Sequence, residues 1–154
     1  MRRRLITKVA VWCAISVFAA GATGCSSASN EPSAAGAHST CTQAQFSPQQ
    51  FTGDWTEPGD TTITTLGADG TLKSLGGTEN QSGTWNYAPW GSTPAKHAMP
   101  AGEADHCVLW LHWTDPQPAT DMIYVPLNVT TTSLQLSYVG RGNTLSWTRP
   151  NAAD

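Results

Sequence analysis

The sequence has little positive charge, no long hydrophobic run and none of the short motifs that mark common catalytic and metal sites. Lys and Arg number 8 against 11 Asp and Glu, and the absence of a basic patch disfavours a nucleic-acid partner. The longest apolar segment, residues 9–22, is shorter than the roughly 20 residues that a helix needs to cross a bilayer. GxSxG, CxxC, HxH and HExxH are absent, so we expect no catalytic residue, no metal site and no cofactor.

The N-terminal residues have the three-part layout of an export signal. A basic leader over residues 1–8 precedes an apolar run over residues 9–20, and small residues lead into Cys25. A cysteine at this point resembles the lipobox of bacterial lipoproteins, although that family prefers Leu, Val or Ile where this chain has Ala22. The resemblance implies that the signal peptide 1–24 is removed and that the Cys25 thiol carries a diacylglyceryl group. The protein would then be lipid-anchored on the extracytoplasmic face of the cell membrane. The alternatives are an ordinary secreted protein cut nearby and an uncleaved anchor helix, and the short apolar run counts against the helix.

Removal of the leader changes the charge of the chain. It takes away four basic residues, Arg2, Arg3, Arg4 and Lys8, and leaves 4 basic against 11 acidic residues, a formal charge of 4 − 11 = −7. No polybasic segment remains to bind anionic headgroups, so membrane attachment would depend on the acyl chains alone. The small and polar residues 25–40 predict a flexible tether.

Two cysteines remain beyond the leader and the lipid-attachment position. Cys13 leaves with the signal peptide, and an exported domain with only Cys41 and Cys107 favours a disulfide between them. Two free thiols or a metal site are the alternatives, but Cys107 and the neighbouring His106 show no metal-ligand spacing.

Residues 41–154 have the pattern of a single all-β domain. Short β-prone runs alternate with turn signals, and no segment shows a convincing helical period. We expect about eight antiparallel strands in an up-and-down meander that closes into a barrel, with a β-sandwich as the alternative. The expected strands are 53–56, 61–66, 71–75, 83–87, 107–114, 122–129, 133–139 and 144–149.

The alternation within the strands predicts which side chains face the core. In the strand from Cys107, the side chains of Cys107, Leu109, Leu111 and Trp113 share a face, and Trp110 points outward. In the next strand the alternation predicts the following inner face: Ile123, Val125, Leu127 and Val129.

Gly53-x-Trp55 in the first strand and Arg149 at the end of the last are similar to the structural signature of the lipocalin-like (calycin-type) barrels. The resemblance spans about 100 residues. It implies that Trp55 lies at the closed end of the barrel and that Arg149 packs across it in a cation–π contact. Gly53, Trp55 and Arg149 would therefore be structural rather than ligand-binding residues.

Two functions from different classes follow from this organisation. The first is a non-enzymatic carrier that binds a small hydrophobic or lipid-like ligand inside the barrel. The simpler interpretation is that the inward-facing aromatic side chains only fill the core. The second is an interaction or assembly module with a filled core, which presents Trp90 and the loop 88–105 to an envelope protein. The alternative for Trp90 is that its side chain folds back onto the domain. A hydrolase or redox role through His106 and Cys107 is a third hypothesis. The candidate ligand-lining residues are Trp85, Tyr87, Leu109, Leu111, Trp113, Tyr138 and Trp147.

Overall fold

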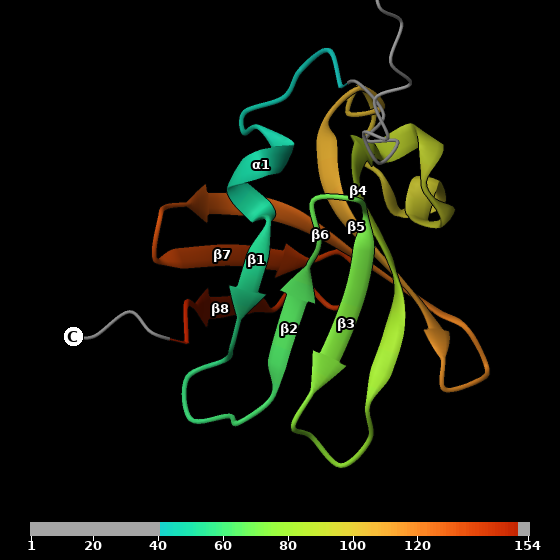
Figure 1. The fold of residues 1–154 in the computed structure, drawn as a ribbon. Coiled ribbons are helices and arrows are strands. Elements are labelled where there is room, and N and C mark those ends of the chain that lie inside the picture. The colour runs from blue at the N-terminus through green and yellow to red at the C-terminus, as the bar shows by residue number, and fades with distance from the viewer. Residues whose placement is uncertain (1–40, 151–154) are drawn as a thin grey trace, which may run out of the picture. The chain divides into compact units, whose positions relative to one another are not determined.

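The fold is a single antiparallel sheet in which each strand pairs with its neighbour in the chain. The structure, a computed structural model, describes residues 41–150, so the predicted signal peptide, the predicted lipid attachment at Cys25 and the predicted tether all lie outside the described residues. The sheet has eight strands in the order β1 to β8 (Figure 1). The strands are β1 (Gly53–Trp55), β2 (Ile63–Leu66), β3 (Thr71–Leu75), β4 (Gln81–Pro89), β5 (Cys107–Asp115), β6 (Thr120–Val129), β7 (Ser133–Tyr138) and β8 (Thr144–Thr148).

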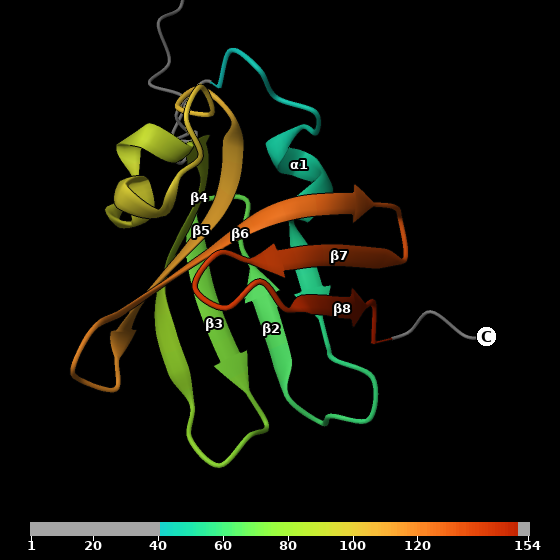
Figure 2. The same cartoon turned by 180° about the vertical axis from the view of Figure 1, so that it is seen from behind.

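The two edges of the sheet meet, so the sheet forms a nearly closed barrel. Thr56, directly after β1, pairs with Thr148 of β8 through two backbone hydrogen bonds, 2.9 and 2.8 Å long. Seen from behind, β7 and β8 run across β1 to β3 on the other side of the barrel (Figure 2). Closure leaves few unpaired strand edges. The predicted all-β barrel is confirmed, and the alternative sandwich is not adopted.

Three short helical segments, which the sequence patterns did not predict, lie before β1 and between β4 and β5. They are α1 (Pro48–Phe51) and the 3₁₀ turns η1 (Trp90–Ser92) and η2 (Pro94–Ala98). Each is only about one turn long, so none can display the period by which amphipathic helices are recognised. The Ser47 amide donates to Gln50 Oε1 at 2.8 Å at the start of α1. The last residue of α1, Phe51, is fully buried and packs in the barrel core.

Trp55, Arg149 and Gly53 form a compact group at the end of the barrel next to α1. The guanidinium carbon of Arg149 lies 3.6 Å from the centroid of the Trp55 ring, and the Trp55 Nε1–H donates to the Phe51 carbonyl at 2.7 Å. Gly53 has a φ of 108°, and a Cβ at this position would collide with Nη1 of Arg149. This is the packing that the resemblance to calycin-type barrels implies.

Large apolar side chains fill the barrel interior. Phe51 contacts Tyr87 with ring centroids 4.8 Å apart, and Tyr124 contacts Tyr138 at 5.3 Å. The predicted inner face of β5 is confirmed, since Cys107, Leu109 and Leu111 are buried there. The buried members of the core are Phe51, Trp55, Leu66, Leu72, Trp85, Tyr87, Cys107, Leu109, Leu111, Tyr124, Val129, Leu134, Leu136 and Trp147.

The predicted inner face of β6 is wrong for most of its length. Ile123 and Val125 point outward, whereas Met122 and Tyr124 pack in the core. The cause is a register shift between Pro126 and Asn128 in the pairing with β7. A bulge inserts one extra residue and therefore exchanges the two faces on either side of it. Leu127, the extra residue, is 51 % exposed, and only Val129 beyond the bulge faces inward as expected.

The predicted disulfide between Cys41 and Cys107 is confirmed. The two Cα atoms lie 5.9 Å apart, although 66 positions separate the residues in the chain. Gln43 also forms a parallel bridge with His106, directly before β5. The first described residues are therefore fixed to the start of β5.

Candidate functional site

The seven residues predicted to line a ligand cavity fall into two groups. Trp85, Tyr87, Leu109, Leu111 and Trp147 lie inside the barrel and are at most 6 % exposed. They pack against one another and against Phe51, so their side chains occupy the interior. Trp113 and Tyr138 are only partly buried and pack against the edge of the same core.

Trp113 lies near the β5–β6 turn, where a small surface pocket opens. This pocket has a volume of about 300 Å³ and is lined mainly by Trp113, Met122 and the turn residues Pro116 to Pro118. A smaller pocket of about 80 Å³ lies beside Glu57, whose carboxylate accepts a 3.2 Å hydrogen bond from Trp147 Nε1. Burial, followed by the charges of Tyr138 and Glu57, raises the pKa of the neighbouring Tyr124 to about 12.

The loop between β4 and β5 folds back onto the outside of the barrel. Trp90 is only 7 % exposed and packs against Val108 and Ile123 on the outer wall. Its Nε1–H donates to the Ala95 carbonyl at 3.2 Å. The sequence left two possibilities for Trp90, exposure to a partner or folding back onto the domain. The side chain folds back, and it packs on the outer wall of the barrel. The exposed loop residues include Lys96 and His97 of η2.

A third pocket lies on the outer wall, where β4 and β5 run side by side. We call it the outer-wall pocket; its volume is about 370 Å³. The β2–β3 turn borders it through Asp69 and Gly70, and Trp85 contributes to its floor. Its remaining walls come from Thr84, Asn86, Trp110 and His112.

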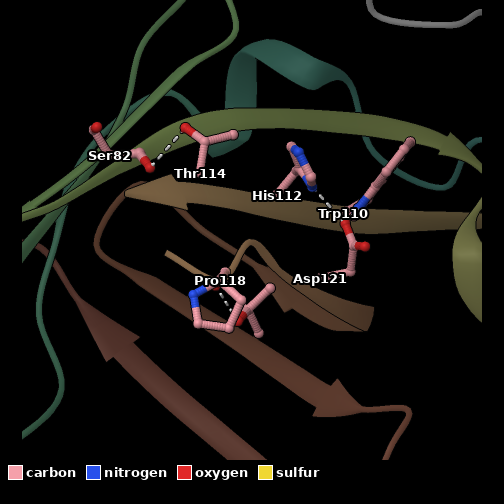
Figure 3. Close-up of polar contacts among 7 residues, drawn as sticks. Ser82, Trp110, His112, Thr114, Pro118 and Asp121 are labelled. Atoms are coloured by element: carbon pink, nitrogen blue, oxygen red, sulfur yellow. Dashed lines mark hydrogen bonds and ion pairs between the residues drawn. The ribbon is translucent and has the colours of Figure 1, made fainter. Parts of the chain in front are cut away.

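Asp121 of β6 holds two aromatic side chains of this pocket in place (Figure 3). Its Oδ1 accepts a hydrogen bond from Trp110 Nε1 at 2.7 Å and contacts His112 Nδ1 at 2.7 Å. A carboxylate oxygen accepts hydrogen bonds, so the Nδ1–H of His112 donates to Asp121. The two rings pack edge to face, with centroids 6.1 Å apart.

The polar residues of the outer-wall pocket include one with an unmet hydrogen bond. Asn86 Oδ1 is buried and has no hydrogen-bond partner, the only such side-chain atom among residues 41–150. Asp69 stands on the opposite side and accepts hydrogen bonds from the Thr71 amide at 3.0 Å and the Thr71 hydroxyl at 2.7 Å. These bonds lower the pKa of the Asp69 carboxyl, so it is ionised at neutral pH.

Sequence reasoning did not predict the outer-wall pocket. Alternation placed Trp110 outward, as observed, but it did not bring His112, Asp121 and Asn86 together beside it. The signal was present in the breaker 115–118: a hairpin centred on it pairs His112 with Asp121, as observed. The partner of a strand residue follows from the turn midpoint, so the register of this hairpin was readable in advance.

The rest of the described chain offers little catalytic or metal-binding chemistry. Across residues 41–150 there is no cluster of three His, Cys, Asp or Glu side chains that could hold a metal ion, and within the same range no helix is long and apolar enough to cross a membrane. His106 Nδ1 lies 3.0 Å from a carboxylate oxygen of Glu103, and Cys107 is in the disulfide. No protein-family model, curated protein or solved structure matches this chain.

Proposed function

We propose that the protein is a non-enzymatic, lipid-anchored module on the extracytoplasmic face of the cell membrane that binds an envelope protein through its outer surface. The observation that carries this proposal is the filled barrel. Five of the seven candidate lining residues are packed in the core, so the interior has little room for cargo. The barrel then acts as a rigid scaffold for its outer surface.

The loop between β4 and β5 is the part of that surface best placed for a partner near the membrane. Its base is tied to β5, since the Trp90 amide donates to the His106 carbonyl at 2.8 Å. The disulfide fixes Cys41 to Cys107 beside the same base. Cys41 follows Cys25 by 16 positions, and 16 residues span at most about 58 Å when extended. An anchor at Cys25 would therefore keep Cys41, at the base of this loop, within about 58 Å of the membrane surface.

Photo-crosslinking in cells tests this function. A photoreactive amino acid at the exposed His97 should give a discrete crosslinked product with a membrane or envelope protein. Gln135, an exposed strand residue of β7, is the control position and should give none. Equal products at both positions, or no product at His97, would contradict the proposal.

The anchor is tested separately with a Cys25→Ser variant. The wild-type chain should fractionate with membranes and incorporate a labelled fatty acid, whereas the variant should do neither. A wild-type chain that is recovered unlabelled and unattached would refute the lipoprotein assignment, whatever the crosslinking shows.

The pocket beside Trp113 and Met122 favours a second candidate function. Its volume of about 300 Å³ is at the lower limit for a small-molecule site, so a small hydrophobic ligand could be carried at this end of the barrel. Organic extraction of the purified protein followed by mass spectrometry should then recover a bound lipid, and lipid titration should change the Trp fluorescence. Failure of both measurements would remove the carrier function.

A further inference from the structure

The outer-wall pocket brings an indole ring and a carboxylate to one small cavity. Its volume of about 370 Å³ lies near the lower end of the roughly 300–1,000 Å³ found for small-molecule sites. Trp110 and Asp69 both line this volume. A ligand of one ring or a short chain can therefore contact both groups at once.

Trp110 offers a ligand its ring surface and no hydrogen bond. Its single N–H is donated to Asp121, and an indole has no acceptor. The side chain packs against the outer-wall residues Val108 and Ile123 and makes an edge-to-face contact with His112. These contacts hold the indole in place. The surface of a fixed indole binds either a cation or an apolar group.

Asp69 offers a carboxylate oxygen that the protein leaves open. Its Oδ1 accepts hydrogen bonds from the amide and the hydroxyl of Thr71, while Oδ2 accepts none from the residues that the structure describes. The bonds from Thr71 and, to a lesser extent, the charge of Lys73 lower the pKa of the carboxyl, but within residues 41–150 Asp69 forms no ion pair. A charged N–H donor is the group that best satisfies such an oxygen.

The charges around the pocket favour a cation over an anion. None of the seven residues that line it is Lys or Arg. Asp69 in its wall and Asp121 behind the two rings contribute two negative charges, and a protonated His112 would contribute one positive charge. The pocket is therefore negative whether or not His112 is protonated, and an anionic ligand would find no counter-charge.

We propose that the outer-wall pocket binds a small organic cation, namely a protonated amine carried on an apolar group. The ammonium group donates to Oδ2 of Asp69, and the apolar group lies on the indole of Trp110. A neutral ligand would leave Asp69 without a counter-charge. This inference goes beyond the proposed function, because it involves neither the loop between β4 and β5 nor the lipid anchor.

Calorimetric titration of the purified mature protein in a non-ionic detergent tests the charge preference. The probes are benzylamine, benzyl alcohol and benzoate, which share one aromatic ring and are cationic, neutral and anionic at neutral pH. Benzylamine should bind saturably in the millimolar range or tighter. Benzyl alcohol should bind at least about threefold more weakly, and benzoate should not bind.

Two substitutions locate the site, and urea unfolding of each variant shows that it is folded. Asp69→Asn keeps the Oδ1 that accepts from Thr71 but removes the charge, so benzylamine should bind at least about threefold more weakly and benzyl alcohol as before. Trp110→Leu keeps an apolar side chain but removes the aromatic surface, and it should weaken benzylamine by a similar factor.

Asp60→Asn is the matched control for the loss of charge. Asp60 Oδ1 also accepts a hydrogen bond from the amide two residues further on, that of Thr62, at 2.9 Å. Asp60 does not line the outer-wall pocket, so this variant should bind benzylamine like the wild-type protein.

Three outcomes would overturn the proposal. One is the absence of saturable benzylamine binding. Another is benzyl alcohol binding as tightly as benzylamine, which would make the pocket a site for neutral aromatic ligands. The third is benzylamine binding that is unchanged in Asp69→Asn, which would place the cation elsewhere. None of these results bears on crosslinking at His97 or on lipid attachment at Cys25.

Discussion

Replacement of Arg149 by Met tests whether its guanidinium group stabilises the closed end of the barrel. The group lies over the Trp55 ring, donates from Nη1 to the Asp54 carbonyl at 3.3 Å, and donates from Nε to the Thr131 carbonyl at 3.4 Å. These contacts join β8 to β1 and to the β6–β7 turn. Met keeps most of the aliphatic stem and removes the three interactions.

The expected cost follows from those contacts. A half-buried cation–π contact is worth about 1 kcal/mol. Each of the two long, partly exposed hydrogen bonds adds about 0.5–1 kcal/mol. The free energy of unfolding should therefore fall by about 2–3 kcal/mol. With a urea m-value of about 2 kcal/mol/M, the urea midpoint should fall by about 1–1.5 M.

Urea denaturation followed by Trp fluorescence measures this change. Arg149→Lys keeps the positive charge but loses the planar fork, so about 1 kcal/mol should be lost. Arg141→Met is the matched control, because Arg141 is exposed in the β7–β8 turn. If Arg149→Met and Arg141→Met both lie within about 0.5 kcal/mol of the wild-type protein, the reasoning about the closed end is wrong.

Two further predictions concern β6 and its neighbour. Burial raises the pKa of Tyr124 from 10.0 to about 12, so its neutral form is favoured in the folded state. The unfolding free energy should be unaffected by this group below pH 10 and should decline between pH 10 and 12, by about 3 kcal/mol in total. Tyr124→Phe should reduce that decline in urea unfolding at each pH, and parallel curves would contradict the assignment. Leu134→Ala should cost about 2–5 kcal/mol because Leu134 is fully buried, whereas Leu127→Ala at the bulge should cost under about 0.5 kcal/mol; equal costs would show that the register of β6 is different.

Much of the fold could be predicted because its signals are local. Turn residues and alternation identified the eight strands, and Asp69-Gly70 placed the hairpin between β2 and β3. The inner face of β5 was correct because its alternation runs without interruption. The inner face of β6 was wrong because the bulge after Pro126 depends on pairing with β7, and residues 122–129 alternate well in either register.

The candidate sites were less accessible to sequence reasoning. Whether Trp85 and Tyr87 line a cavity or fill a core depends on the volume enclosed by all eight strands and on Phe51 from α1. No single strand carries that information. The outer-wall pocket has the same dependence, since it joins residues of β4 and β5 with the β2–β3 turn, and Asp121 of β6 holds two of its side chains.

The sequence by itself determined the all-β meander, the pairing of Cys41 with Cys107 and the positions of Trp55 and Arg149, because turn chemistry, cysteine number and a short motif are properties of the chain. It also carries the prediction of a lipid anchor at Cys25. Only the tertiary structure decided that the barrel is filled, that Trp90 packs against its outer wall, and that Asp121 holds Trp110 and His112 beside Asn86. These features depend on strand register and on packing between distant segments, where a single extra residue exchanges the inside of a strand with its outside.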